Sequence, residues 1–97
     1  MNGKPHIYGN RVVTKTQVND AIGRALSQIK SDDNLTWEEV GVVLGKSEDR
    51  AMAYAVGDEM GAYAFLRARH AWGDRFTAAA DKLLPAHVDE NQIRSVA

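Results

Sequence analysis

Apolar residues recur every three or four positions along most of this chain, which is the spacing of one face of an α-helix. Short breaks that contain Gly, Asp, Asn or Pro divide this pattern into five segments. They predict an all-α fold of five helices, over residues 16–31, 36–44, 48–56, 58–71 and 74–84. Residues 1–15 lack this period, and we interpret them as an extended arm with short strands at residues 7–8 and 11–14.

Local capping signals define the ends of the second and third predicted helices. Thr36, followed three residues later by Glu39, fits a capping box. Gly45 suits the left-handed position that ends many helices, and Ser47 can cap the helix that follows. Two short helices joined by such a tight turn are typical of a helix-turn-helix. The other boundary residues that we predict are Thr14 or Thr16, Asp58 or Glu59, Gly73, Asp74 and Pro85.

The helical spacing also predicts which side chains form the core. Each helix presents one apolar stripe, and we expect Trp37 and Trp72 to pack in the core or at its edge. The inward-facing positions are Val18, Ile22, Ala25, Leu26 and Ile29; Trp37, Val40, Val43 and Leu44; Ala51, Tyr54 and Ala55; Met60, Tyr63, Ala64, Arg67 and Ala68; and Phe76, Ala79, Ala80, Leu83 and Leu84.

The composition is that of one small soluble domain: 97 residues, of which 44% are hydrophobic and 26% are charged. No apolar run is long enough to span a membrane, and the N-terminal residues lack the apolar segment of a signal peptide. The chain has no cysteine, and so no disulfide or thiolate ligand. We expect a cytoplasmic protein with a basic arm over residues 1–15, a helix-turn-helix domain over 16–85 and a polar tail over 86–97.

Charge is unevenly distributed along the chain, although the net charge is only −1. Residues 1–31 carry five basic and one acidic side chain, whereas residues 32–66 carry two basic and eight acidic side chains. Basic arms can follow DNA phosphates or enter a minor groove, and an acidic segment opposes a polyanion. The sequence therefore assigns phosphate affinity to the arm, with Arg11 and Lys15 as its candidate contacts.

The stretch L-T-W-E-E-V-G-V-V-L-G-K-S, over residues 35–47, resembles the opening of the Cro/repressor-type (XRE-like) helix-turn-helix domains of phage and prophage regulators. Val40 and Leu44 occupy the apolar slots of that family, and Gly41 occupies the slot where the two helices approach closely. The resemblance implies a phage-repressor-like bundle that binds double-stranded DNA as a homodimer. Residues 47–56 would then enter the major groove.

Several positions depart from the family pattern. Trp37 replaces a Gln that commonly contacts phosphate, Lys46 replaces an apolar turn residue, and Ala55 replaces a frequent Glu. After the third helix, where the family often has phosphate-contacting groups, this chain has Val56 and Asp58. The scaffold of the family is thus matched more closely than its DNA-contacting chemistry.

The resemblance also locates a candidate DNA-binding surface, with base-reading positions at residues 47–49, Met52 and Ala53. Basic side chains of the turn and of the arm extend this surface. The DNA-binding residues that we predict are Lys46, Ser47, Glu48, Asp49, Arg50 and Ala53 on the motif, and Arg11 and Lys15 on the arm.

Glu48 and Asp49 allow three interpretations. Acidic side chains stabilise the N-terminus of a helix through its dipole. A carboxylate can also accept a hydrogen bond from cytosine N4 in the major groove. The same acidic face can instead meet a basic surface on a partner protein. Arg50 has two interpretations, because it can contact DNA or pair locally with Glu48 or Asp49.

Nothing in the sequence indicates catalysis, a metal site or a cofactor. The three histidines are far apart, and none has a metal-ligating companion three or four residues away. No glycine-rich phosphate loop follows a predicted strand. We therefore expect a binding protein and not an enzyme.

A second hypothesis uses the same fold for protein binding. The acidic middle third and the missing phosphate contacts fit an antirepressor, an inhibitor or an assembly adaptor that presents its acidic face to a basic partner. A second basic cluster, formed by Arg67, Arg69, His70 and Arg75, is interpreted as solvated surface.

Overall fold

A computed structural model describes residues 13–85, and within that range the fold is all-α, as the periodicity predicts. Residues 1–12, with Arg11 and the first predicted strand, lie outside the described part of the chain, as does the tail over residues 86–97. The helices are α2 (Lys15–Asp32), α3 (Trp37–Leu44), α4 (Glu48–Ala55), α5 (Ala62–Trp72) and α6 (Asp74–Leu83).

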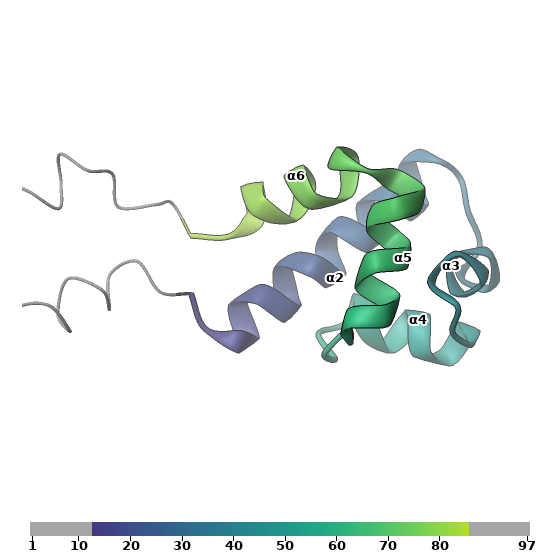
Figure 1. The fold of residues 1–97 in the computed structure, drawn as a ribbon, viewed down its shortest axis with the longest axis horizontal. Helices are drawn as coiled ribbons and strands as arrows, with labels where there is room; N and C mark the ends of the chain where they lie inside the picture. The colour runs from purple at the N-terminus through teal and green to yellow at the C-terminus, as the bar shows by residue number, and fades with distance from the viewer. Residues whose placement is uncertain (1–12, 86–97) are drawn as a thin grey trace, which may run out of the picture.

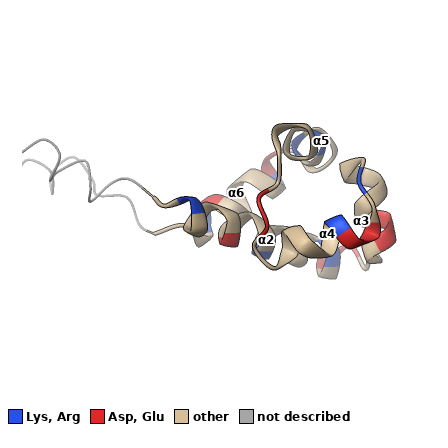
Figure 2. Ribbon diagram, turned by 90° about the horizontal axis from the view of Figure 1, so that it is seen from below, with Lys and Arg blue, Asp and Glu red and all other residues tan. Residues whose placement is uncertain are grey.

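The five helices form two groups joined by α5 (Figures 1 and 2). α6 lies alongside α2, and α3 pairs with α4. α4 also packs on α2, while α5 contacts α3 on one side and α6 on the other. Both ends of the described chain lie at the end of the molecule opposite α3. α3 therefore stands away from both ends of the described chain.

The core lies where the two groups meet, and every buried side chain in the described range is apolar. Phe76 of α6 is fully buried, and its ring centroid lies 5.7 Å from that of Phe65 and 6.0 Å from that of Trp72. Trp37 and Trp72 are partly buried against this core, which confirms the expected packing of both tryptophans. The other fully or nearly fully buried residues are Ala21, Ala25, Leu26, Ile29, Val40, Leu44, Ala51, Tyr54, Ala64 and Ala68.

One close backbone approach joins α2 to α4. A Cβ atom added to Gly23 would lie 2.5 Å from the Tyr54 carbonyl oxygen and 2.7 Å from that of Ala55. Real Cβ atoms do not approach so closely, so only glycine lets the two helix backbones meet here. The α2–α4 contact therefore depends on a residue inside the first predicted helix, where glycine otherwise lowers helix stability.

The predicted start of the fourth helix is wrong. α5 begins at Ala62 and not at Asp58 or Glu59. Gly57 has a φ of +114°, and residues 58–61 form a non-helical link whose Met60 side chain is buried. The carboxylates of Asp58 and Glu59 bind basic side chains of other helices and cap nothing.

Four smaller predictions also need correction. Lys15 is the first residue of α2 and not the last residue of an arm, and residues 13–14 form no strand. Asp74 is the first residue of α6, with Gly73 as its cap. Tyr63 points outward and is exposed, so it is not part of the apolar stripe of α5.

Candidate functional site

The segment from Thr36 to Ala55 folds as two short helices with well-defined ends. The Thr36 hydroxyl accepts from the Glu39 backbone N–H, and the Glu39 carboxylate accepts from the Thr36 N–H at 2.8 Å, which confirms the capping box. Gly45 ends α3 with a φ of +70°, in the left-handed region. Ser47 then caps α4 by accepting from the Arg50 N–H.

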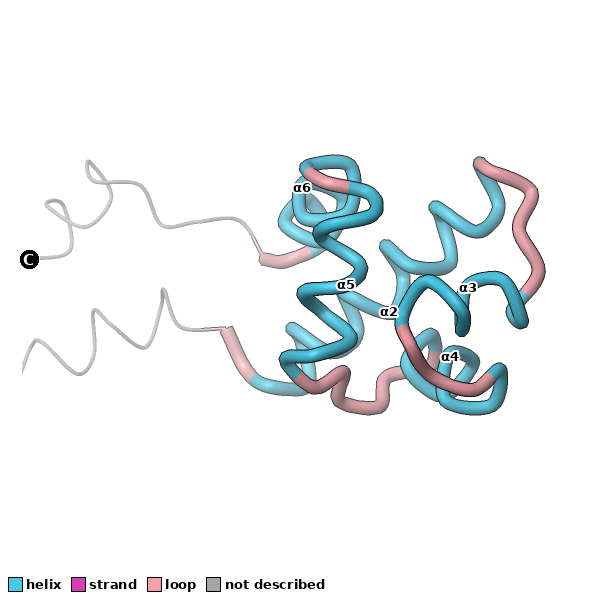
Figure 3. The backbone as a smooth tube through the Cα atoms, turned by 45° about the vertical axis from the view of Figure 1, so that its right-hand side comes forward, coloured by secondary structure: helices cyan, strands magenta, loops and turns pink. Residues whose placement is uncertain are grey.

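A short turn connects α3 to α4 (Figure 3). Two backbone hydrogen bonds close it: the Lys46 N–H donates to the Gly41 carbonyl at 2.9 Å, and the Gly45 N–H donates to the Val42 carbonyl at 3.2 Å. These two bonds are those of a Schellman motif. A Cβ atom on Gly41 would lie 2.8 Å from the Lys46 carbonyl oxygen, so the small residue expected at this position is required.

α4 buries one side and exposes the other. Ala51 and Tyr54 are buried, as predicted, whereas residues 45–50 are all exposed. Met52 and Val56 are the large apolar residues of the exposed side, with 38% and 86% of their surface accessible. Ala53, a predicted DNA contact, is only partly exposed.

The exposed residues 45–50 carry both signs of charge, two basic and two acidic side chains (Figure 2). Glu48 and Asp49 lie in the first turn of α4, where the helix dipole favours them. Arg50 does not pair with either of them: its Nη1 atom lies 3.3 Å from the Asp58 carboxylate. Its guanidinium also lies 4.9 Å from the centre of the Tyr54 ring. Arg50 thus forms an ion pair, which was one of its two interpretations, but with a carboxylate beyond the end of α4 and not with Glu48 or Asp49.

Lys15 lies beside the segment that follows α4. Its Nζ atom is 2.9 Å from the Glu59 carboxylate, and the hydrogen bond and the charge of Glu59 raise the pKa of Lys15. This pair places the start of α2 next to the link between α4 and α5. The structure thus brings Lys46, Ser47, Glu48 and Asp49 together on one face, whereas Arg50 and Lys15 are each paired with a carboxylate.

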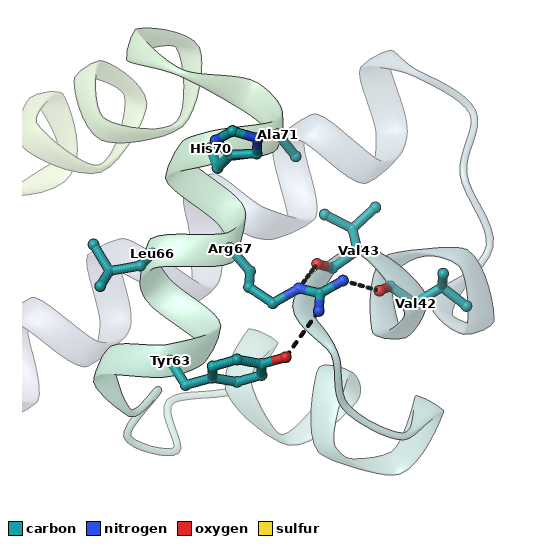
Figure 4. Close-up of a pocket in the computed structure, with 7 residues that line it drawn as sticks. All are labelled: Val42, Val43, Tyr63, Leu66, Arg67, His70 and Ala71. Atoms are coloured by element: carbon teal, nitrogen blue, oxygen red, sulfur yellow. Dashed lines mark hydrogen bonds between the residues drawn. The ribbon is translucent and has the colours of Figure 1, made fainter.

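Arg67 has a role that the sequence reasoning missed (Figure 4). From α5, its Nε donates to the Val43 carbonyl at 2.9 Å and its Nη2 to the Val42 carbonyl at 3.2 Å. Its Nη1 donates to the Tyr63 hydroxyl at 2.8 Å. The last carbonyl groups of a helix lack hydrogen-bond donors within the helix. A cationic donor at this end both satisfies these carbonyl groups and interacts favourably with the helix dipole. Arg67 caps the C-terminus of α3 and is not simply solvated.

Arg75 likewise belongs to the framework and not to a basic patch. Two of its guanidinium nitrogens donate to the two carboxylate oxygens of Asp33, at 2.8 and 3.1 Å. These bonds join the start of α6 to the residue that follows α2. The hydrogen bonds from Arg75 lower the pKa of Asp33 below its ordinary value of 3.8, and the carboxylate raises the pKa of Arg75.

Comparisons of the chain with protein-family models, with curated proteins and with solved structures give no match. Between residues 13 and 85, no group of three or more His, Cys, Asp or Glu side chains is arranged to hold a metal ion. The helices of this same range are too short or too polar to cross a membrane.

Proposed function

We propose that this protein is a small DNA-binding regulator of the Cro/repressor type, with α3 and α4 as its helix-turn-helix and α4 as the helix that enters the major groove. The observation that carries this proposal is the exposed first turn of α4, which follows a tight glycine turn. The opposite side of α4 is buried in the core and holds the helix in place. A reading helix needs this combination of a rigid base and an open face.

The exposed side of α4 offers a specific set of contacts to a base pair. Ser47 can donate or accept, Met52 can pack on a thymine methyl group, and Glu48 or Asp49 can accept from cytosine N4. These groups supply sequence preference but little phosphate affinity. The general affinity then comes from Lys46 on the turn and from the basic residues that precede α2.

Fluorescence anisotropy with two DNA duplexes tests the proposal. One duplex carries the promoter region of the protein's own gene and the other a random sequence, each at about 50 and 200 mM salt. We expect preference for the promoter and a loss of affinity of roughly a hundredfold or more over that salt range. Arg11→Glu should weaken binding to both duplexes, and Lys82→Glu on α6 is the matched charge control. An absence of binding to either duplex at low salt contradicts the proposal.

A second candidate is a protein-binding module that uses the acidic side of α4. It is favoured by the pairing of Arg50 with Asp58 and of Lys15 with Glu59, which leaves Lys46 as the basic side chain beside Glu48 and Asp49 that no carboxylate of residues 13–85 neutralises. The variant Glu48→Gln/Asp49→Asn separates the two functions. If α4 meets phosphates, this variant should bind random DNA more tightly, because two negative charges are removed. If α4 meets a basic protein, binding of that protein should be lost.

A further inference from the structure

A shallow apolar groove lies between α3 and α5, on a different surface from the exposed side of α4 (Figure 4). It has a volume of about 630 Å³, and we call it the α3–α5 groove. Val42 and Val43 line it from α3, and Tyr63, Leu66 and His70 line it from α5. The Arg67 guanidinium spans it from one helix to the other.

The groove gathers three of the five exposed large hydrophobic residues between residues 13 and 85. Val42, Tyr63 and Leu66 have 69%, 58% and 55% of their surface accessible, and the other two are Met52 in α4 and Val56 just after it. Single exposed apolar side chains are common on protein surfaces, but several that share one hollow indicate a binding site.

The two sides of the groove differ in charge, and the α5 side is the basic one. No residue that lines it is acidic, and the α5 side carries Arg67 and His70. Arg69 adjoins them in a smaller hollow that it shares with Leu66 and His70. On α3, the nearest carboxylates along the helix are those of Glu38 and Glu39, about one turn before Val42 and Val43. A bound segment should therefore carry negative charge on the side that faces α5.

We propose that the α3–α5 groove binds an amphipathic helix of a partner protein, with apolar side chains three or four residues apart and with carboxylates along the edge that meets Arg69 and His70. Such helices bind grooves through apolar residues at positions i, i+3 or i+4, and i+7. Val42, Tyr63 and Leu66 then contact the apolar side of the partner helix, and Arg69 pairs with its carboxylates. This inference does not rest on DNA binding by α4.

The groove is suited to this role because its two sides are already fixed. Arg67 donates to two carbonyl groups of α3 and to the Tyr63 hydroxyl, so one side chain holds α3, α5 and the Tyr63 ring in place. A binding surface that needs no rearrangement loses little free energy on association. Arg67 therefore belongs to the frame of the groove, and Arg69 is the group left to recognise charge.

Two synthetic peptides of about four helical turns test the proposal on the full-length chain. Both carry leucines at positions i, i+4 and i+7, and one has glutamates where the other has lysines. Binding is measured by isothermal titration calorimetry and located by amide chemical-shift changes in NMR spectra. We expect the acidic peptide to bind at least about tenfold more tightly than the basic one, with shifts centred on Val42, Tyr63 and Leu66.

Variants of exposed residues make the test specific. Leu66→Glu should abolish binding of the acidic peptide, whereas Val56→Glu, a matched change just after α4, should leave it unaltered. Arg69→Glu should reverse the preference between the two peptides. Circular dichroism shows whether each variant is folded, and the DNA affinity of Leu66→Glu should equal that of the unmodified protein.

Three outcomes overturn the proposal. The first is that the acidic peptide fails to bind at millimolar concentration. The second is that binding is insensitive to Arg69→Glu or that the shifts lie on α4. The third is self-association in sedimentation experiments that Leu66→Glu abolishes, because a second copy of this chain would then occupy the groove.

Discussion

The α3–α4 pair is attached to the rest of the protein in two different ways. At α4 the attachment is direct: its backbone meets that of α2 at Gly23, and Tyr54 and Ala51 are buried beside this contact. At α3 the side chains of Val40 and Leu44 reach the core, but on the side that faces α5 the Arg67 guanidinium bridges the two helices and the surface beside it stays open. The first contact tolerates no added atom, whereas the second leaves room for another molecule. The comparison predicts that substitutions at the two contacts will lower the free energy of unfolding by different amounts.

The largest effect is expected at the closed contact. Gly23→Ala would place a methyl group 2.5 Å from the Tyr54 carbonyl oxygen, so α2 and α4 must move apart, at a cost of about 3 kcal/mol of unfolding free energy. Urea denaturation measures this cost. Gly61→Ala, at a position with open space around it, should cost less than about 1 kcal/mol.

The sign of the Gly23→Ala effect is itself decisive. Alanine in place of glycine inside a helix normally stabilises a protein by about 0.5–1 kcal/mol. A variant that is more stable than the original protein would therefore show that the backbones of α2 and α4 are not in close contact.

The second largest loss of stability is expected at the open contact, between α3 and α5. Arg67→Met keeps an unbranched chain of similar length but removes all three hydrogen bonds of the guanidinium, and it leaves the Val43 carbonyl without this donor. We expect a loss of about 1–2 kcal/mol in urea denaturation. Arg69→Met on the same helix should change stability by less than about 0.5 kcal/mol. Equal losses in the two variants would mean that Arg67 does not hold α3.

These two contacts also show what the sequence could and could not reveal. The ends of α3 and α4 were predictable because each signal and its partner lie within a few residues: Thr36 with Glu39, and Gly45 with the turn. A glycine inside a helix, such as Gly23, can indicate a close backbone approach, but the sequence does not show that α4 is the helix that approaches it. Arg67 bonds to a carbonyl 24 residues away, and no local pattern encodes that distance.

Some features of the candidate site were also predictable from the sequence, and others were not. The exposure of residues 46–49 follows from their place in the motif, and the structure agrees. Arg50 and Lys15 carry the expected charge, but Asp58 and Glu59 bind them from the link after α4. Those two acidic residues are typical helix caps, which is why the start of α5 was predicted too early. Contact with DNA stays a prediction.

A smaller effect should come from the cap of α3. Thr36→Ala removes the hydroxyl that accepts from the Glu39 N–H, which should cost about 1 kcal/mol of unfolding free energy. Thermal unfolding followed by circular dichroism measures it. Thr16→Ala is the matched control, because Thr14 and not Thr16 caps α2. A cost of the same size at Thr16 would contradict this assignment.

The smallest effect, and the one that best separates the two kinds of arginine bridge, depends on pH. Arg67 binds carbonyl groups, which do not titrate, whereas Arg75 binds the Asp33 carboxylate. Because Arg75 lowers the pKa of Asp33 in the folded protein, its stabilising contribution is complete above the ordinary value of 3.8 and is lost as the pH falls through the lower, folded value. The melting temperatures of the unmodified protein and of Arg75→Met should therefore differ slightly at neutral pH and converge below about pH 4.

The loss of melting temperature caused by Arg67→Met supplies the contrast in the same titration. It should persist through this acid range, since the two carbonyl groups that Arg67 binds do not titrate. A deficit of Arg75→Met that also persists in acid would mean that Arg75 stabilises the junction of α2 and α6 by packing and not by its bond to Asp33. If the loss of melting temperature caused by Arg67→Met vanished once Asp33 is protonated, the two arginine bridges would be coupled through the core. The α3–α5 contact would then not stabilise the protein independently of the junction of α2 and α6.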